Sequence, residues 1–299
     1  MKKVKSGLIN FKIVFTFIIT LLFSCDNEKD TFTWPELLET GELIQITTTN
    51  ASSWDFHSRW SNDGSKVAFA RFNSTNSDLS LNIWDKPTNE IKIVVSGLWG
   101  DCAPSWSPDD MKIAIDVRDE NDVSQIYIVN VNDGQLEKLT TTDSNKFRPC
   151  WSKDGNKIIF TSSGNLYTVP AEGGSGVIIP NTQHASNAQW NFDDSQILFV
   201  KDSQNDDIYI VNNDGTELTL VAEGKSGTNE NWASWSPDGT KIIYQLYHKG
   251  TPRLIMKDLK LDKEYLLLDK DDCRFADWSP DGNSIVFAHD ENLWLLSLN

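Results

Sequence analysis

The sequence predicts an all-β fold, a six-bladed β-propeller with four antiparallel strands in each blade. Three observations lead to this prediction. A motif that starts with tryptophan recurs six times, each copy is followed by apolar runs of strand length, and the last copy lacks a final strand that a segment near the N-terminus resembles. Four-stranded repeats of about 40–45 residues are typical of propeller blades.

The repeated motif is a tight turn that follows a tryptophan. Proline presets the second position of a type I turn, and glycine takes the left-handed conformation at its end. Asp110 and Asp194 occupy the glycine position in two copies. We therefore expect Asp110→Gly to relieve backbone strain and to raise stability by up to about 1 kcal/mol. The most regular copies read Trp-Ser-Pro-Asp-Gly, and the six begin at Trp60, Trp106, Trp151, Trp190, Trp235 and Trp278.

Two more strands and a second turn follow each motif. The second strand is a continuous apolar run, such as residues 242–244, as expected for a strand covered on both faces. The third strand reads Ile-Tyr-Ile-Val at 126–129 and again at 208–211. Asn-Asp-Gly at 132–134 and 213–215 is a strong hairpin signal that leads into a fourth strand. We expect the six periodic tryptophans to pack between blades.

The two ends of the chain indicate how the ring closes. The sixth repeat stops at Asn299, after its third strand. Residues 41–47, Gly-Glu-Leu-Ile-Gln-Ile-Thr, resemble the fourth strand at 134–140, Gly-Gln-Leu-Glu-Lys-Leu-Thr. We therefore predict that the N-terminal strand completes the last blade and removes the open edges of the array.

The first 24 residues have the pattern of an export signal. Four lysines accompany an apolar stretch at 11–23 that is too short to be a comfortable transmembrane span. Leu22-Phe23-Ser24-Cys25 resembles the lipobox of bacterial lipoproteins, which implies cleavage before Cys25 and lipidation of its thiol. The acidic run after Cys25 resembles a surface-export signal and implies outer-membrane attachment, either periplasmic or surface-exposed. We expect a flexible tether at 25–40 and the propeller at 41–299.

The repeat as a whole resembles the WD-like repeat of the TolB-type propellers. The resemblance rests on Trp-Ser-Pro-Asp-Gly-x-Lys-Ile-x-Phe, the Ile-Tyr-Ile-Val strand and the Asn-Asp-Gly turn, and it covers residues 41–299. TolB itself carries an α/β domain before its propeller, whereas only a tether is expected here. The resemblance implies a rigid interaction scaffold in the cell envelope.

Charge and cysteine content narrow the partners. Removal of residues 1–24 removes four lysines and no acid, which takes the net charge from −16 to −20. Such a surface repels phosphate backbones, so we expect no nucleic-acid partner. Cys102, Cys150 and Cys273 remain, either as one disulfide with a free thiol or as three buried thiols. Without a Cys-x-x-Cys pair, we expect no thiolate zinc site.

The candidate binding residues lie in the segments that lead into the tryptophan strands. Strict alternation of strand direction places these segments on one face, at the mouth of the central channel, where a rigid scaffold presents function. Trp54, Trp99 and Trp232 lie outside the repeat and could form an aromatic platform for a glycan or peptide. The predicted site comprises His57, Arg59, Asp101, Arg148, His184, Glu230, Arg274 and Asp277.

Two functions from different classes fit these features. We favour a non-catalytic scaffold for an envelope protein or peptide partner, monomeric, anchored to a membrane through Cys25, and without cofactor or metal. The alternative is a metal-dependent polysaccharide lyase or hydrolase, similar to the oligogalacturonate lyases, which use a histidine-rich channel site. His57, His184, His248 and His289 map to one face and could imitate such a site if they converge.

Overall fold

The computed structural model describes residues 32–202, 205–225 and 227–298. The chain divides into two compact units, Met1–Trp34 and Pro35–Asn299, and the second unit is the propeller. Its described residues form strands, turns and loops, without a helix among them. No helix in the described part is long and apolar enough to cross a membrane. The predicted signal peptide at 1–24 and Cys25 lie outside the described residues.

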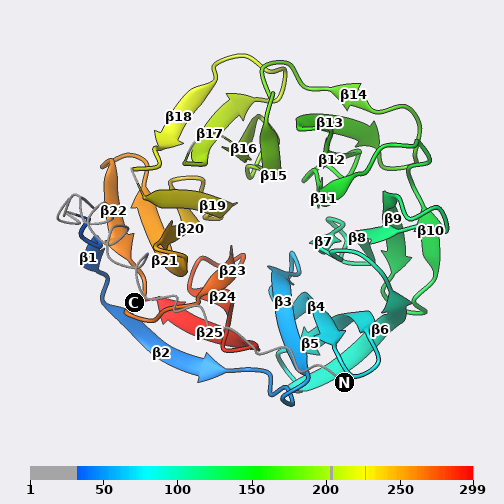
Figure 1. Ribbon diagram of the computed structural model, residues 1–299, viewed down its shortest axis with the longest axis horizontal. Coiled ribbons are helices and arrows are strands. Elements are labelled where there is room, and N and C mark those ends of the chain that lie inside the picture. The colour runs from blue at the N-terminus through cyan, green and yellow to red at the C-terminus, as the bar shows by residue number, and fades with distance from the viewer. Residues whose placement is uncertain (1–31, 203–204, 226, 299) are drawn as a thin grey trace, which may run out of the picture. The chain divides into compact units, whose positions relative to one another are not determined.

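Six sheets stand around a central axis as the blades of a propeller (Figure 1). The first blade comprises β3 (Ser53–Trp60), β4 (Lys66–Asn73), β5 (Asp78–Asp85) and β6 (Glu90–Leu98). The second comprises β7 (Ser105–Trp106), β8 (Lys112–Arg118), β9 (Ser124–Asn130) and β10 (Leu136–Lys138). The third comprises β11 (Phe147–Trp151), β12 (Lys157–Ser162), β13 (Asn165–Pro170) and β14 (Val177–Ile178).

The other three blades follow the same order from the axis outward. The fourth comprises β15 (Ala185–Trp190), β16 (Gln196–Lys201), β17 (Asp207–Asn212) and β18 (Thr219–Ala222). The fifth comprises β19 (Thr228–Trp235), β20 (Lys241–His248), β21 (Thr251–Asp258) and β22 (Lys263–Leu266). The sixth comprises β23 (Arg274–Trp278), β24 (Ser284–His289), β25 (Asn292–Leu298) and β2 (Thr40–Gln45). The predicted all-β, six-bladed and four-stranded architecture is confirmed.

The apolar core lies between neighbouring blades. Trp106 of the second blade packs with Leu81 and Ile83 of the first, and Trp151 of the third blade packs with Ile126 of the second. All six periodic tryptophans are buried. Their burial supplies much of the inter-blade adhesion, because a large aromatic side chain removes a correspondingly large apolar area from water.

The N-terminal strand closes the ring as predicted. β2 pairs antiparallel with β25, so the blue and red strands lie side by side in Figure 1. The Thr47 hydroxyl accepts a hydrogen bond from the Leu293 backbone N–H at 2.8 Å. The Thr140 hydroxyl does the same for the Ile126 N–H at 3.0 Å, so residues 41–47 do what a fourth strand does in an ordinary blade.

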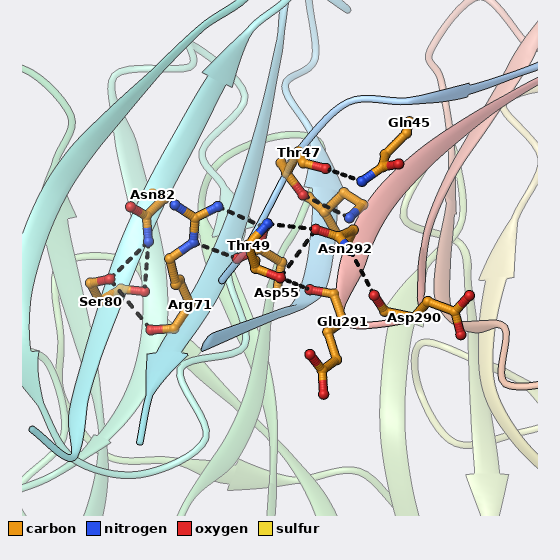
Figure 2. Close-up of polar contacts among 11 residues, drawn as sticks. Gln45, Thr47, Thr49, Asp55, Arg71, Ser80, Asn82, Asp290, Glu291 and Asn292 are labelled. Atoms are coloured by element: carbon orange, nitrogen blue, oxygen red, sulfur yellow. Dashed lines mark hydrogen bonds and ion pairs between the residues drawn. The ribbon is translucent and has the colours of Figure 1, made fainter. Parts of the chain in front are cut away.

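Polar contacts reinforce the seam between the last blade and the first. The Thr49 backbone N–H donates to the Asn292 side chain at 2.7 Å, and the Asp55 N–H donates to the Glu291 carbonyl at 2.9 Å. Arg71 holds the buried Asp55 carboxylate by two hydrogen bonds of 2.6 and 2.8 Å (Figure 2). The bonds of Thr49 and Asp55 to the last blade join residues more than 200 positions apart in the sequence.

The propeller begins slightly before the predicted boundary at residue 41. β1 (Glu36–Leu37) pairs in parallel with β22, and the Leu38 N–H donates to the Leu266 carbonyl at 2.8 Å. Residues 36–38, which fall within the predicted tether at 25–40, thus bond to the fifth blade. Two residues are too few to show a strand period in the sequence, and their partner strand lies more than 220 residues away.

The hydroxyl and carboxylate of the motif hold each turn together. Ser236 donates to Asp238 at 2.6 Å and accepts from the Lys241 N–H at 2.9 Å. The serine hydrogen bond, followed by that of the Thr240 N–H, lowers the pKa of Asp238 to about 2. The same Ser–Asp bond occurs at 61–63, 107–109, 152–154 and 279–281.

Asp110 and Asp194 do more than replace glycine, because their carboxylates bond to the preceding blade, and these bonds oppose the expected gain in stability from Asp110→Gly. Both residues have the left-handed backbone, with φ of 57° and 59°. The Asp110 carboxylate accepts from the Asn62 N–H at 2.8 Å and the Asp63 N–H at 3.0 Å in the preceding blade. Asp194 accepts likewise from the Lys153 and Asp154 N–H groups, at 2.7 and 2.9 Å.

The residue at the proline position of the preceding blade's turn explains why aspartate replaces glycine. Asn62 and Lys153 stand where other turns have proline, so their backbone N–H groups can donate. Where the preceding turn does have proline, as at Pro108, the next blade has glycine, as at Gly155. The aspartates therefore tie neighbouring turns together at sites that proline cannot serve.

We predict that Asp110→Gly lowers the free energy of unfolding. Hydrogen bonds to a charged group contribute about 1.5–3 kcal/mol each, which outweighs the relief of up to about 1 kcal/mol from a strained backbone. Urea unfolding should show a net loss of about 1–2 kcal/mol. Asp110→Asn, which tolerates the same backbone and keeps one acceptor oxygen, should lose less. A glycine variant at least as stable as the wild type would contradict the role of these bonds.

Candidate functional site

A central cavity of about 320 Å³ runs between the innermost strands of all six blades. Two faces open onto it. The turn face carries the Trp-Ser-Pro-Asp-Gly turns. The connector face carries the links from each outermost strand to the next innermost strand, together with the loops between second and third strands. The innermost strands β3, β7, β11, β15, β19 and β23 line the cavity (Figure 1).

A β-bulge shapes five of these six strands at one position. Two residues of the innermost strand oppose one residue of its neighbour, three and two positions before the tryptophan. The first bulge residue is left-handed in every case, with φ between 52° and 55°. These residues are His57, Arg148, Asn187, Trp232 and Phe275.

The composition of the bulge is regular. The second bulge residue is small or proline in each strand: Ser58, Pro149, Ala188, Ala233 and Ala276. The opposing residue on the next strand is a buried aromatic: Phe69, Phe160, Phe199, Tyr244 and Phe287. A bulge re-aims the side chain that it carries. Here His57, Arg148, Asn187 and Trp232 line the central cavity, and Phe275 packs against His57 and Trp232.

Three of these side chains form an aromatic cluster that blocks the channel. The His57 ring stacks on Trp232 with centroids 4.5 Å apart and planes 4° from parallel. Phe275 meets His57 edge-on at 4.4 Å and Trp232 at 4.8 Å. Two cations lie over the same indole, with the Arg148 Cζ 4.9 Å and the Arg59 Cζ 5.5 Å from its centroid. We call these five residues the channel plug.

Burial decides the charge of His57. Burial, opposed by the nearby Asp101 carboxylate and aided by Arg148 and Arg59, lowers the pKa of His57 to about 4. The imidazole is therefore neutral at pH 7, although its Nε2 lies 3.8 Å from an Asp101 oxygen. A neutral ring suits a stack flanked by two guanidinium groups, because a third positive charge there would be repelled.

Asp277 holds the last blade to its two neighbours. Its carboxylate accepts from the Trp60 N–H and from the Ser234 hydroxyl, both at 2.9 Å, and lies 4.0 Å from Arg59. Burial raises its pKa. Ser105 and Gln189, also directly before a tryptophan, likewise accept from the Trp N–H of the next blade.

A groove on the connector face lies beside the plug and has a volume of about 590 Å³. Trp99 and Phe147 flank it, and they are 67% and 36% exposed. Asp101 and Arg148 line it as well, with 3.5 Å between the Arg148 Nε and an Asp101 oxygen. Arg148 lines both the groove and the channel, so it connects the two spaces.

The structure thus brings together five of the predicted site residues: His57, Arg59, Asp101, Arg148 and Asp277. The other three lie apart from the channel. His184 is exposed at the start of β15, and Arg274 pairs with Asp272 at 2.5 Å. Glu230 is buried, which raises its pKa to about 7, and its carboxylate accepts from Thr228 at 3.2 Å.

The four histidines have different surroundings. His57 is in the plug, His184 is exposed, and His289 lies 3.2 Å from Asp290. Within residues 32–202, 205–225 and 227–298, no three His, Cys, Asp or Glu side chains gather in a set that could hold a metal ion. The three cysteines of the described part are unpaired thiols, and burial raises the pKa of Cys273 to about 12.

The sequence analysis missed Asn187, Phe275 and Phe147. A signal for the first two was present, because a small residue or proline stands two positions before each of the six tryptophans. That regular position marks the bulge, and the variable residue before it faces the channel. Phe147 lies one position further out and needs the structure, because its exposure depends on the neighbouring blade.

Comparisons with known proteins agree with this architecture. Residues 45–280 match the family described as TolB beta propeller domain. A stretch of 105 residues is 31% identical to the uncharacterized peptidase YuxL of Bacillus subtilis (strain 168). That stretch is 34% of this chain and 16% of the peptidase, so the chain spans a small part of that relative.

Two solved structures illustrate the fold. TolB from Acinetobacter baumannii has a TM-score of 0.63 at 20% identity, over 75% of this chain and 57% of that one. An oligogalacturonate lyase from Vibrio parahaemolyticus has a TM-score of 0.58 at 15% identity, over 85% of this chain and 93% of that one. At such identities the likeness concerns the fold alone.

We predict that Trp232→Ala opens the plug. Truncation of a buried tryptophan costs about 3–5 kcal/mol, and it should expose His57 to water. The free energy of unfolding should fall by that amount, and the pKa of His57 measured by NMR should rise towards its ordinary 6.5. Trp54→Ala, which alters an exposed ring of β3, should change neither strongly. A His57 pKa that stays near 4 in the Trp232 variant would show that the plug does not bury it.

Acidification gives a second test of the plug. The pKa of His57 is lowered from 6.5 to about 4 on folding, so the unfolded chain takes up this proton first as the pH falls. The contribution of neutral His57 to stability is present above pH 6.5 and is lost progressively towards pH 4. His57→Phe keeps an aromatic ring and cannot titrate, so it should lose less stability than the wild type across this window. Parallel urea-unfolding curves for the two proteins at every pH would contradict this.

Proposed function

The chain belongs to the TolB beta propeller domain family, and from that premise we propose that it is a non-catalytic scaffold that binds a protein or peptide partner in the cell envelope. The observation that carries the proposal is the contrast between the two spaces on the connector face. The rings of the plug pack against one another inside the channel, whereas the groove beside it exposes Trp99 and Phe147. Aromatic side chains and arginine, which this groove combines, are enriched at protein-binding surfaces.

The rigidity of the fold supports a scaffold. The groove is lined by the link that precedes β7 and by residues of β8, β9, β11, β12 and β15. Buried tryptophans pack between neighbouring blades, and hydrogen bonds between turns join the first blade to the second and the third to the fourth. A rigid scaffold with variable links at one face places a recognition surface without reordering the chain on binding.

The envelope location rests on the sequence before the propeller. The apolar stretch at 11–23 and the lipobox-like sequence ending at Cys25 support export and lipid attachment, with the propeller held off the membrane by the segment that follows. We propose outer-membrane attachment of a monomer, in either orientation. The metal-dependent lyase alternative needs convergent histidines, and the described His57 and His184 occupy separate environments.

Affinity capture tests the scaffold. The full-length protein is immobilised and exposed to a detergent extract of the envelope of the bacterium that produces it. We expect one specific partner to be retained by the wild type and reduced at least tenfold by the double variant Trp99→Ala, Phe147→Ala. Leu261→Ala, which removes a 66% exposed apolar side chain on the turn face, is the matched control and should retain the partner.

Two outcomes would contradict the proposal. Equal retention of every partner by the double variant and the control would place binding outside the groove. Cleavage of polygalacturonate by the full-length protein with Mn²⁺ would show catalysis, and it would favour the lyase. Thermal unfolding of all three proteins confirms that each is folded.

A further inference from the structure

The groove contains a guanidinium group that no acceptor satisfies. Arg148 carries five N–H donors, and it makes no hydrogen bond within the described residues. Its Nε is buried and unpartnered, because the Asp101 oxygen lies 3.5 Å away without hydrogen-bond geometry. Buried donors in proteins nearly always find a partner. The Arg148 side chain as a whole is 33% exposed and lines the groove, so the unbonded guanidinium indicates an acceptor that binds from outside.

The position of Arg148 is fixed before any ligand arrives. Its backbone is held in the left-handed conformation by the β11 bulge, with φ of 54°. Its guanidinium lies over the Trp232 ring. Stacking uses the face of a guanidinium, whereas its N–H donors lie in the plane, so the stack leaves them available. A charged group that is already oriented binds its partner with little loss of conformational entropy.

The rest of the groove is also rich in donors. Thr161 lines it, is 8% exposed, and has a hydroxyl without a hydrogen-bond partner. The Arg118 side chain lines it too and donates to Asp122 at 2.7 Å. Asp101 is the one carboxylate among the lining residues. The ligand that complements this set is therefore rich in acceptors, and a carboxylate matches a guanidinium best because it can accept two parallel hydrogen bonds.

The aromatic walls define the rest of the ligand. Trp99 makes no ring contact with another described aromatic or cation, and Phe147 stands exposed nearby. Together they offer an apolar surface next to Arg148. On the basis of the proposed scaffold function, we propose that this groove binds a peptide segment in which a carboxylate, paired with Arg148, adjoins an apolar side chain that packs against Trp99 and Phe147.

The net charge of the chain distinguishes specific binding through Arg148 from nonspecific binding of basic peptides. A net charge of −16 repels an acidic peptide at long range, and salt screens such repulsion beyond about 8 Å at physiological ionic strength. Binding that depends on Arg148 is a short-range contact. Its affinity should therefore hold or rise as salt is added, whereas nonspecific binding of a basic peptide to this acidic surface should weaken steeply.

Fluorescence anisotropy with three labelled octapeptides tests the proposal on the full-length protein. All three are Gly-Ser peptides with one leucine. The first ends in leucine with a free C-terminal carboxylate, the second is amidated and carries a glutamate beside leucine, and the third is amidated and has no carboxylate. We expect the first, the second or both to bind at least tenfold more tightly than the third. The preference between the first two tells a terminal from a side-chain carboxylate.

Variants then assign the carboxylate to Arg148. Arg148→Met keeps the length of the side chain and should abolish the preference over the third peptide, whereas Arg148→Lys should retain part of it. Trp99→Ala should weaken every peptide. Arg274→Met removes a cation of the same face that does not line the groove, and it should change nothing.

Equal binding of the three peptides, or a tenfold preference that survives Arg148→Met, would overturn the proposal. These failures are separable from failure of the scaffold function. A partner whose capture needs Trp99 and Phe147 but is indifferent to Arg148→Met would leave the scaffold standing and remove the carboxylate.

Discussion

One extra residue in the innermost strands is the constraint on which the site depends. A regular strand alternates its side chains between two faces, and in a propeller both faces of a blade are covered by its neighbours. The bulge breaks that alternation three positions before the tryptophan and sends one side chain of each bulged blade to the axis. A left-handed non-glycine residue costs about 1–3 kcal/mol, and five of them at equivalent positions persist because the packing around them is fixed.

The bulged strands bring side chains of different blades together only when the blades form a closed ring. The site therefore depends on ring closure as well as on the bulge. The seam joins β2 to β25 and Asp55 to the loop of the last blade, and Asp277 crosses from the last blade to Trp60 of the first. Only when this seam is closed do His57 of the first blade and Phe275 of the last stand 4.4 Å apart. The plug and the groove are therefore products of the whole ring and not of any one repeat.

The fold could be predicted from sequence because its signals are local and repeated. The turn residues lie within single repeats, and the tryptophan period and the likeness of 41–47 to 134–140 appear when repeats are compared. The role of Asp110 could not be predicted because its contacts are not local. Its own turn suggests strain, and the N–H groups that it binds belong to Asn62 and Asp63 in another blade. The short strand β1 was missed because only its contact with β22 defines it.

The site was predicted in part, and position relative to the tryptophan explains which part. His57 and Arg148 stand three positions before their tryptophans and reach the axis, whereas Glu230 stands five before and is buried away from the channel. The residue types alone do not show which of these side chains reach the channel. The most direct measurement is a crystal structure of the full-length protein with an acidic, leucine-containing peptide. The account predicts the carboxylate within hydrogen-bond distance of the Arg148 guanidinium and the leucine against Trp99. A peptide bound elsewhere, with Arg148 still unbonded, would contradict it.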